Sequence, residues 1–188
     1  AEECIRPKTD AASLAALPSA FGALQGQYAG ALGGETFEPL HTLSHAPPVC
    51  DGAAIALVGG AGLGTPRARV LSFAESGGDP VASLTAGFAA MDKALARAGL
   101  TLADMDRIEF MESFAVTIAK FLRDRDVDQA RVNVSGGHIA KGHPMGASGA
   151  ILTSTLLDCL DEAHGRLGLV VVSGASGVGA AMVVERLN

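Results

Sequence analysis

The stretch Asn133-Val-Ser-Gly-Gly-His-Ile-Ala-Lys-Gly-His143-Pro-Met-Gly-Ala-Ser-Gly-Ala150 carries the densest pattern in the chain. Its glycines let backbone approach a ligand closely, and Pro144 stiffens the turn beside His143. A helix is expected over residues 150–162, so free N–H groups and the positive end of a helix dipole should face this loop. An imidazole there can act as a base or donate a hydrogen bond to a developing oxyanion. His143 is therefore the candidate catalytic residue, and the alternative is a loop histidine with a structural hydrogen bond.

The bulk composition indicates one domain with a core of small side chains. Of the 188 residues, 48% are hydrophobic and only 4% aromatic, so closely packed Ala, Val and Leu must form the core. A net charge of −6 without a basic stripe argues against nucleic acid as a partner. Three scattered cysteines without a CxxC pair favour a reducing, cytoplasmic setting and no metal site. The short apolar runs and the start Ala1-Glu2-Glu3-Cys4 predict neither a membrane span nor a signal peptide.

Two regions differ in their patterning. Prolines and Gly33-Gly34 interrupt residues 1–48, so this segment is expected to be irregular, apart from a short helix over 10–17 capped by Thr9 or Asp10. It is interpreted as a peripheral segment or as the tail of a larger N-terminal part. Residues 49–188 are expected to form one domain. Strands are predicted at 53–58 (buried), 67–74, 107–110, 168–173 and 180–185, and helices at 83–98 (ending at Gly99), 113–123 and 150–162. This alternation, closed by a hairpin-like pair, indicates an α/β layered domain.

The loop around His143 strongly resembles that of the thiolase family, N-x-x-G-G-x-x-x-x-G-H-P-x-G-A-[ST]-G, and matches it at every fixed position. Other segments are similar to family motifs along nearly the whole chain: Ile5-Arg6-Pro7 to iRP, Asp51-Gly52-Ala53-Ala54 to DGAA, residues 98–106 to aGLtl-DiD, Glu112, Phe114 and Ala115 to N-E-A-F-A, and 180–185 to the closing strand. A whole thiolase is considerably longer, so the resemblance is to the C-terminal half only.

The resemblance implies a C-terminal thiolase domain, with a mixed sheet covered by helices and packed on a matching N-terminal half through the helix after His143. It implies an acyltransferase that joins or cleaves carbon chains on coenzyme A. A coenzyme A thioester would be the substrate, with no covalently bound cofactor, and the chain would form a homo-oligomer or pair with an N-terminal half. The nucleophilic cysteine belongs to that half, whereas Cys4, Cys50 and Cys159 are expected to be structural.

The resemblance also assigns the site residues. His143 would be base and oxyanion donor, and Ser173 would fill the catalytic slot of the family's second cysteine. The backbone of Gly174 and Ala175 would form the adjoining turn, and Phe114 would shape the acyl pocket. Glu112, placed with the substrate-binding residues, could by its residue type be a general base, but a capping or dipole role for the helix over 113–123 is favoured.

Three positions depart from the family pattern. Ser173 replaces a thiol of pKa about 8.5 with a hydroxyl of far higher pKa. Met111 replaces an asparagine that positions a water for the oxyanion hole, and Pro47 replaces a serine that contacts the pantetheine arm. Losing an oxyanion donor typically lowers the rate by ~10²–10³, and losing an acid/base lowers it by ~10²–10⁴. A thiolase-like scaffold that binds acyl-CoA or a partner chain without turnover is therefore the alternative function.

Three weaker patterns do not predict a functional site. The turn over 173–179 looks like a dinucleotide loop, but too few residues follow it for a βαβ unit, so nucleotide binding is disfavoured. His41 and His45 would share a helix face, but the prolines around them argue against a helix and a metal pair. His138 is expected to point into solvent near the loop of His143.

Overall fold

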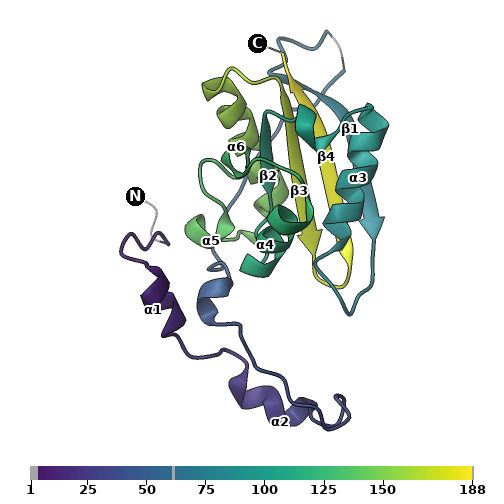
Figure 1. Ribbon diagram of the computed structural model, residues 1–188. Coiled ribbons are helices and arrows are strands. Elements are labelled where there is room, and N and C mark those ends of the chain that lie inside the picture. Colours follow the sequence, from purple (N-terminus) through teal and green to yellow (C-terminus); the bar gives the residue numbers. More distant parts are fainter. Residues whose placement is uncertain (1–3, 61, 188) are drawn as a thin grey trace.

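The computed structural model describes residues 4–60 and 62–187 (Figure 1). The prediction that the chain starts without a signal peptide depends mainly on residues 1–3, which lie outside the described residues. A four-stranded sheet in the order β1-β4-β3-β2 forms the centre of the domain. Its strands are β1 (Ala68–Gly77), β2 (Arg107–Phe110), β3 (Leu167–Gly174) and β4 (Val178–Arg186). β2 and β3 run parallel and the other neighbours antiparallel, which confirms the expected mixed sheet.

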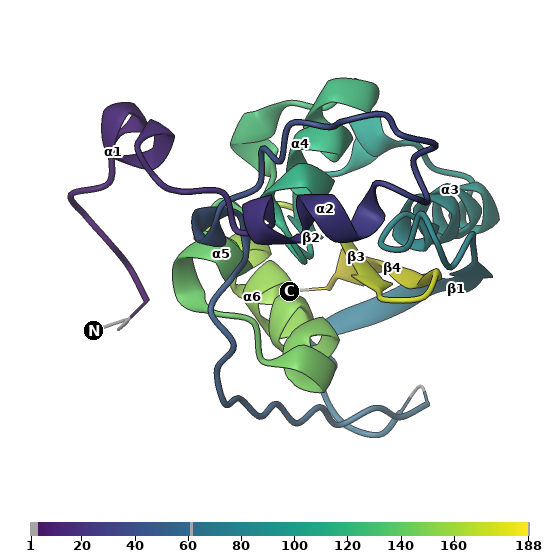
Figure 2. The ribbon, with the colours of Figure 1, turned by 90° about the horizontal axis from the view of Figure 1, so that it is seen from below.

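Helices cover both faces of this sheet (Figure 1, Figure 2). On one face α3 (Ala86–Ala98) packs on β1 and β4, and α4 (Ala115–Asp124) contributes to the same core. On the other face α6 (Ser148–Glu162) packs on β2 and β3. Two apolar cores result, one on each face, which confirms the α/β fold class.

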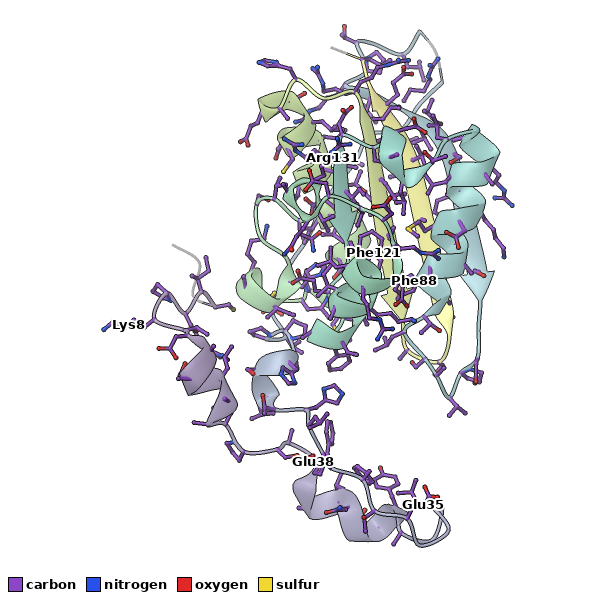
Figure 3. The ribbon with its side chains drawn as sticks, in the orientation of Figure 1. Lys8, Glu35, Glu38, Phe88, Phe121 and Arg131 are labelled. Atoms are coloured by element: carbon purple, nitrogen blue, oxygen red, sulfur yellow. The ribbon has the colours of Figure 1, made fainter. Side chains whose placement is uncertain are left out.

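Three phenylalanines anchor the core beneath α3. The rings of Phe110 in β2 and Phe121 in α4 stack with their centroids 4.5 Å apart, and Phe88 of α3 lies 6.4 Å from Phe121 (Figure 3). Each aromatic ring buries far more area than the alanines and valines around it. The three buried phenylalanines are thus gathered where α3, α4 and the sheet meet.

A leucine stripe fixes α6 on the opposite face. Leu152, Leu156 and Leu160 recur at helical spacing and pack with Val170 and Val184 of the sheet. Burying one such leucine typically contributes about 1.5–3 kcal/mol. The stripe therefore holds the start of α6 in place, and with it the glycine-rich loop that precedes the helix.

The ends of α3 follow from local backbone conformation. Gly99 adopts the left-handed conformation at φ 68°, and its amide donates to the carbonyl of Ala96, as expected for a glycine C-cap. The helix begins at Ala86, later than the predicted residue 83, because Ser83 and Leu84 have φ values of 50° and 27°. A right-handed helix cannot include residues with positive φ.

The turn over 173–179 closes a β-hairpin. β3 and β4 pair antiparallel up to Gly174 and Val178, and Ser176 and Gly177 between them have φ values of 62° and 77°. Residues with positive φ are typical of the tight turns that join antiparallel strands. Because a strand follows the turn and not a helix, the structure agrees with rejecting a dinucleotide loop.

The prediction of a buried strand at 53–58 is wrong. These residues join no strand among the described parts of the chain, and Ile55 and Leu57 are 99% and 100% exposed. The apolar run suits a strand, but a strand also needs a neighbour that supplies backbone hydrogen bonds and covers its side chains. Within the described residues no sheet edge does so.

The irregular N-terminal segment extends away from the sheet in Figure 1. It contains α1 (Ala11–Ala15) and α2 (Gln25–Tyr28). Asp10 caps α1 in a capping box with Ser13, as expected. Short 3₁₀ helices occur at Gly22–Leu24, Leu43–His45, Leu102–Asp104, Gln129–Arg131 and Met145–Ala147. In the part of the chain that the structure describes, no helix combines the length and apolarity that crossing a membrane requires.

Candidate active site

The loop that carries His143 is more regular than predicted. It contains α5 (His138–Lys141), and α6 already begins at Ser148. Gly142, at φ 101°, turns the chain out of α5 immediately before His143. The half-buried imidazole of His143 thus stands between two helices, beside the buried first residue of α6.

Ser148 determines which nitrogen of His143 can react. The Ser148 hydroxyl lies 2.9 Å from His143 Nδ1, within hydrogen-bonding distance. With Nδ1 engaged, Nε2 is the atom that can accept or donate a proton. Sequence reasoning did not single out Ser148 as a site residue, although it occupies the serine or threonine position of the family motif.

A short extended segment holds the backbone of His143. The His143 amide donates to the Pro48 carbonyl over 2.7 Å, and the Cys50 amide donates to the His143 carbonyl over 3.4 Å. A side chain at Gly142 would stand only 2.7 Å from Cys50 Sγ, so this approach requires glycine. Pro47, expected near the pantetheine arm, is buried directly before this contact.

His138 does not point into solvent, so that expectation is wrong. Its side chain is 4% exposed, and its ring centroid lies 5.0 Å from that of His143. Burial, with added effects of His143 and Lys141, lowers the pKa of His138 to about 4. Burial also lowers the pKa of His143 below its usual 6.5. Both imidazoles are therefore neutral at pH 7, as a general base must be.

Glu112 caps a helix other than the one expected. Its carboxylate accepts hydrogen bonds of 3.0 Å each from the Ile139 amide in the first turn of α5 and from Asn133 Nδ2. Phe114, without a side-chain cap, precedes α4. Asn133 also exchanges hydrogen bonds with the backbone of Phe110, so the Glu112–Asn133 pair ties the loop to the end of β2. The carboxylate turns to the loop because the unpaired amides of α5 are there.

Ser173 faces the helix layer of α3, on the side of the sheet opposite to α6. Its side chain is 2% exposed, and its hydroxyl accepts a 3.1 Å hydrogen bond from the Gly87 amide in α3. The preceding side chain, Val172, instead lies next to Gly149 in α6. Side chains alternate along a strand, so Ser173 points to the α3 face, whereas His143 is held by the first residue of α6.

The remaining predicted residues divide between core and surface. Met111 is buried and packs with Leu152 and Val170 in the α6 core. Phe114 is 42% exposed, Gly174 is half-buried and Ala175 is exposed. Met111 therefore serves packing, while Phe114 keeps a surface that a ligand can contact.

Comparisons with known proteins point to the same protein family as the sequence motif around His143. A family described as "Thiolase, C-terminal domain" matches residues 64–186. The chain is 37% identical to a 3-ketoacyl-CoA thiolase of Shewanella denitrificans, over 99% of the chain and 47% of that protein. It is 44% identical to an acetyl-CoA acetyltransferase of Escherichia coli, over 78% of the chain and 39% of that protein.

The chain thus spans about half the length of these curated relatives. The matched region contains every strand of the sheet and the whole loop around His143. Since the match covers most of the chain and includes its most specific motif, the chain belongs to the thiolase family and carries that family's C-terminal domain.

Proposed function

We propose that this chain is the C-terminal part of an acyl-CoA C-acyltransferase, which cleaves 3-ketoacyl-CoA with a thiol or forms it by Claisen condensation. The observation that carries the proposal is the His143–Ser148 contact, which leaves Nε2 of a neutral imidazole as the reacting atom. His143 Nε2 takes the proton of a cysteine thiol supplied by an N-terminal half. The resulting thiolate attacks the keto carbonyl, the bond between the α and β carbons breaks, and the acyl group remains on the cysteine as a thioester.

In this proposal the acetyl-CoA carbanion left by that cleavage takes up a proton. The thiol of a second coenzyme A then loses its proton to the group that protonated the carbanion and attacks the thioester, and the departing cysteine thiolate takes back the proton held by His143. Ser173 occupies the slot of the residue that would handle the α-carbon proton, and Phe114, with its exposed face, borders the acyl chain. The names of the relatives, 3-ketoacyl-CoA thiolase and acetyl-CoA acetyltransferase, support this substrate class. A cytoplasmic role in fatty-acid β-oxidation, as a homo-oligomer, belongs to the same proposal.

The exposed stretch 51–60 supports pairing with an N-terminal half. Ile55, Leu57 and Val58 are 83–100% exposed, and the matched C-terminal domain begins only at residue 64. An apolar segment of strand-forming residues is stable in water only when another surface covers it. The N-terminal half that the longer relatives possess is the partner we propose for it.

Pairing is tested by co-expression with the N-terminal half of a relative. Ile55→Asp and Leu57→Asp should abolish co-purification because a charge would be buried in the contact. Val81→Asp is the matched control, since Val81 is also apolar and 90% exposed but lies elsewhere. Equal co-purification of all three variants would contradict the pairing.

A non-catalytic scaffold is the second candidate, and two contacts favour it. The Ser173 hydroxyl is engaged by the Gly87 amide, and Met111 is part of the α6 core. Ser173 is therefore not arranged to act as an acid or base, and Met111 is not arranged to position a water for an oxyanion hole. Such a protein would bind acyl-CoA or a partner chain without turnover.

Thiolysis assays on the intact gene product separate the two functions. If the protein is an acyltransferase, acetoacetyl-CoA is cleaved, His143→Ala abolishes cleavage, and the double variant Met111→Asn/Ser173→Cys raises the rate. A factor of about 10²–10³ corresponds to one restored oxyanion donor. Binding of acetyl-CoA without cleavage, and without gain in the double variant, would establish the scaffold.

A further inference from the structure

His138 and His143 form a pair of packed imidazoles that the proposed mechanism does not require. Their ring centroids lie 5.0 Å apart at an interplanar angle of 56°. Among the described residues, neither ring nitrogen of His138 has a hydrogen-bond partner, and both are enclosed by protein. Buried polar atoms are almost always hydrogen-bonded, because leaving them unpaired is costly. An apolar ring would fill the same space without that cost, so His138 calls for an explanation other than stability.

The position of His138 is set by its backbone and not by its ring nitrogens. It is the first residue of α5, the amide of the next residue donates to Glu112, and the His138 carbonyl accepts from the Gly142 amide over 2.7 Å. A side chain on Gly137 would overlap the Glu112 carboxylate, so the chain approaches that residue closely. The His138 ring is therefore held firmly against its neighbour.

We propose that His138 is a positioning residue for His143, whose ring it backs on the inner side so that the ring keeps its orientation and water is excluded. Ser148 holds Nδ1 of His143, and His138 packs against the same ring. Together they leave Nε2 as the reacting atom. The inference rests on the proposed function only in taking His143 as the base.

The charges around the pair agree with this role. Burial, followed by the effects of His143 and Lys141, lowers the pKa of His138, so this ring is uncharged when His143 takes up a proton. Glu112 is the charged group that anchors the adjoining turn. Burial is what lowers the pKa of His143, and a packed neighbouring ring is part of that burial.

Imidazole NMR on the 188-residue chain tests the inference without substrate. In wild type, His143 should titrate below 6.5, and nuclear Overhauser contacts should link the two rings. In His138→Ala, water reaches the inner side of His143, so its pKa should rise toward the unperturbed value. In His138→Phe the packed ring remains, so the pKa of His143 should stay low. His164→Asn, at an exposed histidine, is the control and should change nothing.

Two results would overturn the inference: an unchanged His143 titration in His138→Ala, or no contact between the rings in wild type. The second needs no variant and so decides the matter even if His138→Ala does not fold. Thiolysis by the intact gene product separates this inference from the proposed function. If His138→Ala shifts the titration of His143 but the wild-type protein shows no thiolysis, the acyltransferase is refuted and the positioning role stands. If the wild-type protein is active but the titration does not move, the acyltransferase stands and the positioning role is refuted.

Discussion

Ser148, the first residue of α6, places its hydroxyl 2.9 Å from Nδ1 of His143. The leucine stripe of α6 anchors that helix to the sheet, so the orientation of the imidazole is set by a core that lies well beyond the loop itself. In the proposed function, an imidazole held in this way needs no reorganisation before it accepts a proton, which is how fixed geometry lowers a barrier.

Replacing Ser148 should impair catalysis more than folding. Ser148→Ala removes the partner of Nδ1, so the ring can rotate and change tautomer, and kcat should fall about tenfold, equivalent to about 1.4 kcal/mol. KM should change little, because the hydroxyl contacts His143 and not the substrate. Ser148→Thr keeps the hydroxyl and is the matched control. A wild-type kcat in Ser148→Ala, measured by steady-state thiolysis of the intact gene product, would refute this role.

Gly87 should not tolerate a side chain. A Cβ there would overlap Ser173 Oγ and stand 2.8 Å from the Val172 carbonyl oxygen. Overpacking of this kind costs about 1–3 kcal/mol, so Gly87→Ala should lower the free energy of unfolding by that amount in urea denaturation. Gly77→Ala is the control, since nothing lies within 4 Å of its added Cβ. Equal stability of the two variants would show that α3 can shift away from β3.

Glu112 should stabilise the loop of His143 through its two hydrogen bonds. Glu112→Ala leaves the Ile139 amide and the Asn133 side chain without their acceptor, and such losses cost about 1–3 kcal/mol. Glu112→Gln keeps one acceptor oxygen and should lose less. Urea midpoints and hydrogen exchange of the α5 amides measure both effects. Faster exchange confined to α4 would instead support the cap that the sequence suggested.

Glu109 should make stability depend on pH. Its side chain is 1% exposed, and burial raises its pKa from 4.5 to about 7. Lys141 opposes this rise, and Glu112 adds to it. At pH values between 4.5 and about 7, Glu109 keeps its proton in the folded protein but has lost it in the unfolded chain. Its contribution to stability is therefore full below about pH 4.5 and is lost as the pH rises to about 7.

The loss for Glu109 is on the order of 3 kcal/mol, since each pKa unit corresponds to about 1.4 kcal/mol. Glu109→Gln should flatten the stability curve over this range, whereas Glu75→Gln, at an exposed position on β1, should leave it unchanged. Denaturant unfolding from pH 4 to 8 provides the measurement. A curve with the same slope in wild type and Glu109→Gln would exclude Glu109 as its source.

Local sequence patterns were sufficient to predict a structural feature where that feature depends on neighbouring residues in the chain. Gly99 ends α3 because glycine adopts positive φ at little cost, and Asp10 caps α1 because its carboxylate reaches nearby amides. The glycine-rich motif around His143 likewise predicted the candidate base and the family. Each of these features is encoded within a few consecutive residues, so the amino-acid sequence by itself determined them.

The tertiary structure alone decided which residues became neighbours. Glu112 caps α5 and not α4, His138 is buried against His143, and Met111 lies in the α6 core, because packing brings together segments far apart in the chain. Residues 53–58 have the composition of a strand but remain exposed, because pairing needs a partner edge that their own sequence cannot provide. Sequence thus determined caps and turns formed by neighbouring residues and pointed to His143 as the candidate base, while long-range packing decided the surroundings of that residue.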